Sequence, residues 1–213
     1  MDIQRFLEQI QLAFSNPLPG PKAHELLTPG KRPMTRQEVE NIDEYRASAV
    51  SIICFAKEDQ INVILTQRPD YNGTHGGQIS FPGGKIEDTD DSLEHTARRE
   101  TFEEIGWILN EKDCLGQMSE IFIPVSKFSV QPYLYFTDKA HDYKLDPREV
   151  VEVIEFPIDL LTDDDIIKLT DIRYSTGLKL KNVPYFSIND KVVWGATAIV
   201  LSELKMMIQT VYS

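Results

Sequence analysis

The sequence predicts a single α/β domain with one added helix at its N-terminus. Short apolar runs rich in β-branched residues, which are typical of strands, alternate with segments whose apolar residues recur at helical spacing. The chain has 213 residues, of which 41% are hydrophobic, and this size fits one domain with a full core. We expect an N-terminal helix and lead-in segment over residues 1–44 and the domain proper over residues 45–213.

Composition and charge restrict the partners that we expect. The net charge is −12, and no basic stripe is available to neutralise the phosphates of a nucleic acid. The chain has no apolar run of membrane-spanning length and no basic stretch followed by an apolar signal segment, so we expect a cytoplasmic protein without membrane contact. Cys54 and Cys114 are expected to be reduced thiols without catalytic duty. A homodimer is compatible with the sequence, which does not fix the oligomeric state.

Helical patterns lie at the two ends of the chain. Apolar residues at helical spacing predict an amphipathic helix over residues 2–13, followed by a Pro- and Gly-rich lead-in with one short helix over residues 36–42. Residues 160–169 contain three consecutive aspartates, which we interpret as an acidic helix start without chemistry. A long apolar helix is predicted from Trp194 to about Val211.

Strand patterns occupy most of the remaining chain. The first two predicted strands are joined by five residues and therefore indicate a β-hairpin, and a second hairpin is predicted over residues 172–186. The other apolar or alternating runs predict single strands. The predicted strands outside the second hairpin are residues 47–55, 61–66, 78–81, 120–124, 129–136 and 149–157.

A helix in the middle of the chain carries an unusual group of acidic residues. Asp91 is the expected N-cap, and Gly106 lies just beyond the expected last turn. At about 100° per residue, Glu100, Glu103 and Glu104 fall within an arc of roughly 100° beside the less polar face. Three carboxylates are therefore crowded on one strip of the helix.

This crowding favours a bound cation. Like charges three or four residues apart on a helix repel each other, so the group does not stabilise the helix by itself. Carboxylate oxygens at this density suit Mg²⁺ or Mn²⁺. The alternative is a solvated acidic face, on which Arg99 forms an ordinary surface ion pair.

Together with the glycines upstream, this helix resembles the signature of the Nudix hydrolases. The matching positions are Gly84, Arg99, Glu100, Glu103, Glu104 and Gly106. The loop between Gly84 and Arg99 is one residue longer than the general pattern, and Asp90 occupies the place of the loop glutamate, which leaves the role of Asp90 open. The resemblance implies a Nudix fold, in which a mixed curved β-sheet is sandwiched between α-helices.

A longer motif is similar to that of one branch, the coenzyme A pyrophosphatases. Residues 65–68, Gly77 and residues 81–84 match this motif, and the same branch commonly carries the longer loop. Two positions differ, because Pro69 replaces Ser or Ala and Gly73 replaces an Arg. The resemblance implies hydrolysis of coenzyme A or its derivatives to 3′,5′-ADP and 4′-phosphopantetheine. The alternatives are another nucleoside diphosphate derivative such as ADP-ribose, or a non-catalytic module that binds a nucleotide.

The resemblance also implies roles for individual residues. Glu100, Glu103 and Glu104 would hold Mg²⁺ or Mn²⁺, and Arg99 would orient them. Gly83, Gly84 and Arg68 would contact the substrate. For Arg68, the residues alone leave a phosphate contact and a simple pair with an acidic neighbour equally open.

Further candidates lie outside this motif, and each also has a purely structural interpretation. Any one of Glu149, Glu152 and Glu155 is a candidate metal ligand or general base, or a charge on an exposed strand face. His75 either contacts the substrate or is solvated. An aromatic group in residues 133–136 either lines a nucleotide pocket or packs in the core.

Overall fold

The computed structural model describes residues 2–30, 33, 35–70, 77–138, 140–173 and 179–209, and its centre is an eight-stranded mixed sheet. The strands are β1 (Arg46–Lys57), β2 (Gln60–Gln67), β3 (Ile79–Ser80), β4 (Gly83–Lys85), β5 (Cys114–Gln117), β6 (Ile121–Ile123), β7 (Phe128–Thr137) and β8 (Glu152–Pro157). The main order is β3-β2-β1-β7-β5, and β4, β6 and β8 pair with β1, β7 and β2 respectively. Strands β1 and β7 are parallel, and the remaining pairs among the described residues of this sheet are antiparallel.

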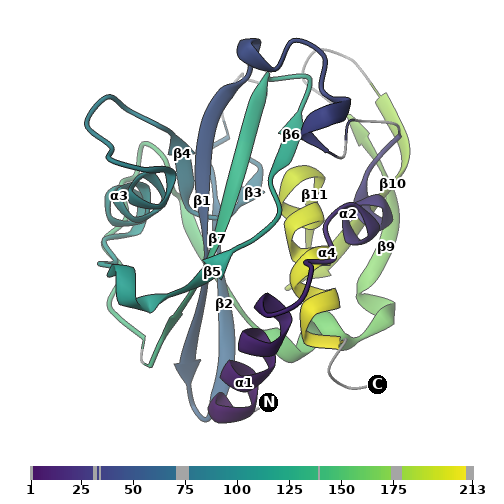
Figure 1. The fold of residues 1–213 in the computed structure, drawn as a ribbon. Helices are drawn as coiled ribbons and strands as arrows, with labels where there is room; N and C mark the ends of the chain where they lie inside the picture. The colour runs from purple at the N-terminus through teal and green to yellow at the C-terminus, as the bar shows by residue number, and fades with distance from the viewer. Residues whose placement is uncertain are drawn as a thin grey trace.

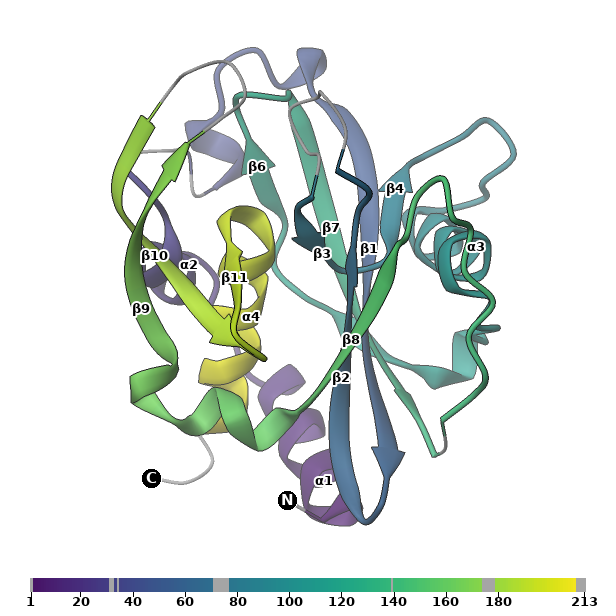
Figure 2. The ribbon, with the colours of Figure 1, turned by 180° about the vertical axis from the view of Figure 1, so that it is seen from behind.

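Helices cover both faces of this sheet. The helices are α1 (Ile3–Phe14), α2 (Pro21–Leu27), α3 (Leu93–Ile105) and α4 (Gly195–Gln209). Helix α3 lies on one face, and the other three helices lie on the opposite side (Figures 1 and 2). A three-stranded antiparallel sheet in the order β11-β10-β9 also lies on the side of α4. Its strands are β9 (Ile167–Arg173), β10 (Lys179–Ile188) and β11 (Lys191–Trp194). The expected arrangement of a mixed sheet between helices is confirmed.

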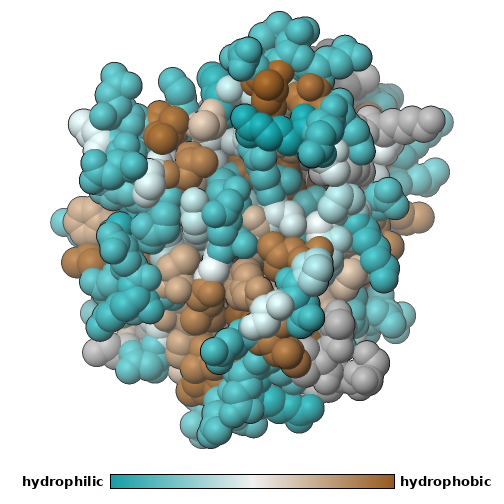
Figure 3. Space-filling view, viewed as in Figure 1, coloured by the Kyte–Doolittle hydropathy of each residue, from teal (hydrophilic) through white to brown (hydrophobic). Residues whose placement is uncertain are grey.

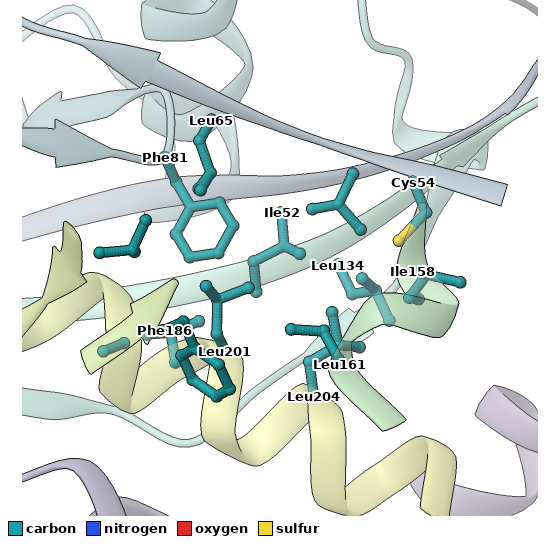
Figure 4. Close-up of a cluster of buried hydrophobic side chains, with 14 of the residues drawn as sticks. Ile52, Cys54, Leu65, Phe81, Leu134, Ile158, Leu161, Phe186, Leu201 and Leu204 are labelled. Carbon is teal, nitrogen blue, oxygen red and sulfur yellow. The ribbon is translucent and has the colours of Figure 1, made fainter. Parts of the chain in front are cut away.

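The alternation of side chains along β1 produces two cores, one on each face of the sheet. Ile52 and Cys54 point into the larger core, towards α4, whereas Ile53 and Phe55 point into the smaller core, towards α3. The close-up in Figure 4 shows sheet residues such as Ile52 packed against side chains from α4 and from the neighbouring 3₁₀ segment. The predicted hairpin of β1 and β2 is confirmed, and its two turn residues, at positions 58 and 59, both have positive φ as a tight hairpin requires.

The N-terminal segment contributes to the larger core. Phe6, Ile10 and Leu27 are fully or almost fully buried there together with residues of α4. Helix α1 has the predicted amphipathic pattern, because its apolar face is the buried one. The boundary at residues 44 and 45 stays a prediction.

Several expected elements differ in the structure. Residues 21–27 form α2, which the sequence did not predict, and the expected helix over residues 36–42 is replaced by two 3₁₀ turns, η1 (Arg36–Glu38) and η2 (Ile42–Glu44). Residues 160–169 do not form the expected helix. They contain parts of the 3₁₀ segments η4 (Ile158–Thr162) and η5 (Asp164–Ile166) and the beginning of β9. A last 3₁₀ turn, η3 (Glu111–Asp113), precedes β5, a strand that was not expected.

None of the helices in the described ranges is long and apolar enough to cross a bilayer. On the face shown in Figure 3, hydrophilic residues predominate, and apolar residues are interspersed among them.

Candidate active site

Helix α3 presents the acidic group and is fixed to the sheet by its buried face. Its N-cap is Ser92, one residue later than expected, and the Ser92 side chain accepts a hydrogen bond from the backbone N–H of His95 at 3.0 Å. Gly106 ends the helix with φ 77°, as predicted. Thr101 is buried, and its hydroxyl donates to the hydroxyl of Ser51 on β1 at 2.9 Å. The helix therefore cannot rotate without breaking a buried polar contact.

Glu104 is the most buried member of the acidic group. Its side chain is only 2% exposed, and the nearest described cation is Arg68, whose Nη2 lies 3.4 Å from Oε1. The second oxygen, Oε2, is buried without a hydrogen-bond partner. Burial raises the pKa of Glu104 to about 8, although Arg68 lowers it in part. Burial also raises the pKa of Glu100, one turn earlier on α3, against the opposing effect of Arg99.

Arg99 organises the outer part of the group. Its Nη1 donates to Glu100 at 2.9 Å and to Glu103 at 3.0 Å, so the two carboxylates share one guanidinium. Asp90 holds the other edge of Arg99 through contacts of 2.8 Å and 2.9 Å, and these contacts hold the pKa of Asp90 well below its usual range. Asp90, whose role the sequence left open, therefore anchors Arg99.

The two glycines lie on β4, directly beside α3. The strand pairs Gly83 with Val50 and Gly84 with Ala49 on β1. Residues 83–85 therefore form a short strand that the sequence did not predict. A Cβ on Gly84 would lie 2.3 Å from the nearer oxygen of Glu100, and a Cβ on Gly83 would lie 2.3 Å from a backbone oxygen of β1. Glycine is required at both positions because the carboxylate and the strand approach so closely.

A third carboxylate joins the cluster from outside α3. Ligand atoms of Glu100, Glu104 and Glu149 all lie within 4.8 Å of one another. Glu152 and Glu155, the other two candidates from this part of the sequence, are each paired with a lysine. Glu103 is 54% exposed and is not part of this group, so its role as a ligand stays a prediction.

The cluster of Glu100, Glu104 and Glu149 fits a divalent metal ion. It offers only oxygen ligands, which Mg²⁺ and Mn²⁺ prefer. The partnerless oxygen of Glu104 supports this assignment, because a buried carboxylate oxygen without a partner costs free energy that a cation would offset. An open cavity of about 450 Å³, lined by residues 85–89 and Glu100, borders the cluster.

The other sequence candidates are placed as follows. Arg68 pairs with Glu104, so it has an acidic neighbour, which is one of the two interpretations that the sequence left open for it. Tyr135 is fully buried in the smaller core and donates its hydroxyl to Glu94 at 2.9 Å, so its ring belongs to the core. His75 and Gly73 lie outside the described residues.

Comparison with known proteins assigns the family. Residues 45–173, more than half of the chain, match the model of the NUDIX domain family. The chain belongs to the Nudix family. The Nudix expectation from the sequence is therefore confirmed, and residues 84–106, which carry the signature positions, lie inside the matched range.

Individual Nudix relatives are similar over part of their length. A probable nudix hydrolase of Schizosaccharomyces pombe is 32% identical over 143 residues, which cover 66% of this chain and 48% of that protein. A mitochondrial coenzyme A diphosphatase of Homo sapiens is 32% identical over 130 residues, 60% of this chain and 54% of that protein. This chain thus spans about half of the length of both relatives.

The fold is also found in a solved Nudix structure. A MutT/nudix family protein from Enterococcus faecalis superposes with a TM-score of 0.54 at 15% identity, over 84% of this chain and 66% of that one. This likeness supports the Nudix fold.

Proposed function

We propose that this chain is a metal-dependent Nudix pyrophosphohydrolase that cleaves the diphosphate linkage of a nucleotide derivative. The observation that carries the proposal is the cluster of Glu100, Glu104 and Glu149, whose ligand atoms lie within 4.8 Å of one another. For the substrate we propose coenzyme A or one of its derivatives, with 3′,5′-ADP and 4′-phosphopantetheine as products. The motif over residues 65–84 and the human relative named a coenzyme A diphosphatase support this choice.

The carboxylates of the cluster would bind Mg²⁺ or Mn²⁺. Glu104 and Glu100 would supply oxygens from helix α3, and Glu149 would supply one from the loop before β8. Glu103 would add a ligand after it leaves Arg99, which is its partner at 3.0 Å. The chemistry that such a cation supplies is polarisation of the phosphoryl oxygens and a lowered pKa of water.

Two arginines would act on different partners. Arg99 is clamped by Asp90 and holds Glu100 in the orientation that faces the cluster. Arg68 reaches the edge of the cluster at Glu104 and is 29% exposed, so its planar fork can donate hydrogen bonds to a phosphoryl oxygen of the substrate. Gly83 and Gly84 allow the backbone to approach the diphosphate closely.

A carboxylate at the cluster would also take the proton of the attacking water. Glu149 is exposed and lies at the cluster, whereas the Glu152 carboxylate accepts a hydrogen bond of 2.7 Å from the Lys191 ammonium. We therefore propose Glu149 as the proton acceptor. Attack of the water on one phosphorus would break the bond to the bridging oxygen, and the second phosphate would leave with that oxygen.

A turnover panel tests the proposal. Coenzyme A, ADP-ribose, NADH and diadenosine polyphosphates are offered separately with Mg²⁺ and with Mn²⁺, and products are separated by chromatography. The proposal predicts the highest kcat/KM for coenzyme A, with no turnover in a chelator. Preference for ADP-ribose would replace the substrate but keep the chemistry. Absence of turnover on every compound by the folded, metal-loaded protein would favour the non-catalytic nucleotide-binding module.

Location and assembly also stay proposals. We propose a cytoplasmic location from the sequence, while the human relative is mitochondrial by name. A homodimer is compatible with the sequence, which does not fix the oligomeric state. Cell fractionation tests the location, and light scattering on the purified protein tests the assembly.

A further inference from the structure

Glu149 faces Glu100 and Glu104 although all three groups are acidic. Their carboxylate oxygens lie within 4.8 Å of one another, and like charges this close repel each other, so the approach of Glu149 is electrostatically unfavourable without a cation. Glu149 also lies on a loop rather than on a helix or strand. Other contacts must therefore hold this loop against α3.

An aromatic stack holds part of this loop, which connects β7 to β8, against the end of α3. The ring of Tyr143 lies parallel to the ring of Trp107, with centroids 5.3 Å apart and planes inclined by only 7°. Trp107 follows α3 and is 1% exposed, and Phe55 of β1 packs edge-on against it at 5.4 Å. The Tyr143 hydroxyl donates to Glu155 on β8 at 2.6 Å. Tyr143 is thus held at its ring by the end of α3 and at its hydroxyl by the sheet.

Backbone hydrogen bonds continue from the stack to Glu149. The N–H of Lys144 donates to the carbonyl of Ile105 at 2.9 Å, and the N–H of Asp146 donates to the carbonyl of Glu104 at 3.1 Å. The Asp146 carbonyl then accepts the N–H of Glu149 at 3.0 Å. The position of Glu149 is therefore tied to the backbone of Glu104, its partner in the cluster.

Gly106 makes this close approach possible. A Cβ at this position would lie 2.7 Å from the Cβ of Lys144 and 3.1 Å from its backbone nitrogen. Real Cβ atoms essentially never approach another atom as closely as 2.7 Å, so a side chain at position 106 would push the loop away from α3. Gly106 thus ends the helix in the left-handed conformation and also leaves room for the loop to pack against α3.

We propose that the stack of Tyr143 on Trp107 is a positioning device that fixes Glu149 opposite Glu100 and Glu104 and thereby sets the affinity for the divalent cation. Neither aromatic residue belongs to the carboxylate cluster, so both act through the loop. This inference rests on the proposed metal site, and it adds two residues that the metal site itself does not contain.

Mn²⁺ titration of purified variants, followed by the electron paramagnetic resonance of free Mn²⁺, tests the inference without an activity assay. Tyr143→Leu removes the stack and is expected to raise the dissociation constant about tenfold, the usual range for groups that orient ligands. Tyr143→Phe keeps the ring and is expected to stay within about twofold of wild type, since the ring and not the hydroxyl forms the stack. Urea unfolding in a chelator measures the lost packing separately.

A double-variant cycle separates positioning from general destabilisation. In a Glu149→Gln background, Tyr143→Leu is expected to leave the Mn²⁺ dissociation constant unchanged, because the group that it positions has lost its charge. Tyr45→Leu is the matched control, because Tyr45 packs edge-on against Phe122 at 6.0 Å and not against this loop. It should retain the wild-type dissociation constant.

Two results would overturn the inference in distinguishable ways. If wild type binds Mn²⁺ and Tyr143→Leu lowers only the stability, or weakens binding equally in both backgrounds, the positioning role is wrong and the metal site stands. If wild type binds no Mn²⁺, the proposed function fails and the inference fails with it.

Discussion

The buried carboxyl of Glu104 gives the sharpest prediction. Its ionisation is expected to lower the stability of the metal-free protein and to favour the binding of a divalent cation. Its pKa is raised by burial from 4.5 to about 8 in the folded chain. Between these values the folded state keeps a proton that the unfolded state releases, so stability in a chelator falls as the pH rises. The limiting slope is about 1.4 kcal/mol per pH unit. Glu104→Gln removes this term, since the amide does not titrate.

The expected magnitude follows from these pKa values. From about pH 6 to about pH 7.5, wild type should lose roughly 2 kcal/mol of unfolding free energy through Glu104. The raised pKa of Glu100 acts in the same direction in both proteins. Urea unfolding in a chelator at several pH values should therefore show a flatter pH dependence for Glu104→Gln than for wild type.

Metal addition should stabilise wild type more than Glu104→Gln. Mn²⁺ at about 100 times its dissociation constant stabilises the folded state by roughly 2.7 kcal/mol, and the variant should gain much less.

Glu103→Gln is the matched control for the pH experiment in a chelator, because Glu103 lies on the same helix and is 54% exposed while Glu104 remains intact. It should retain the wild-type pH slope. Parallel pH slopes for Glu104→Gln and wild type in a chelator would refute the reasoning.

Three further substitutions test the surroundings of the cluster. Gly84→Ala places a Cβ 2.3 Å from Glu100 and should weaken Mn²⁺ binding at least about tenfold in calorimetry; wild-type affinity would show that the carboxylate can move aside. Asp90→Asn removes the charge that clamps Arg99 and should lower kcat about tenfold with little change in KM, and an unchanged kcat would assign Asp90 a structural role only. Glu103→Gln should lower turnover of the best substrate by about a hundredfold if Glu103 joins the metal ligands, and near wild-type turnover would remove it from that set.

The elements that the sequence predicted correctly are those whose signals are local. Helix α3 has a capping residue at its start and Gly106 at its end, and the expected N-cap was wrong by only one residue, because Asp91 and Ser92 are both good caps. The β1–β2 hairpin has two apolar runs and a short polar connection, which identify a hairpin without knowledge of its neighbours.

The elements that the sequence did not predict depend on distant contacts. Three aspartates resemble a helix start, but Lys205 on α4 donates to the carbonyls of Leu161 and Asp163 at 2.6 Å and 3.2 Å. These carbonyls are bound by a side chain from another element and do not continue a helix. Helix α2 has only seven residues, so its apolar pattern is too short to be recognised.

The same distinction applies to the candidate site. Glu100 and Glu104 were expected to lie together because helical periodicity places residues four apart on one face. Glu149 was only one of three equivalent glutamates, since its position depends on the packing of Tyr143 against Trp107 and on hydrogen bonds to the end of α3. No local pattern encodes that packing.

The most direct test of the account is a crystal structure of the Mn²⁺-loaded protein with anomalous diffraction at the manganese edge. The account predicts an anomalous peak with oxygens of Glu100, Glu104 and Glu149 at about 2.1 Å. A well-ordered structure from crystals saturated with Mn²⁺ that shows no peak among these carboxylates would contradict it.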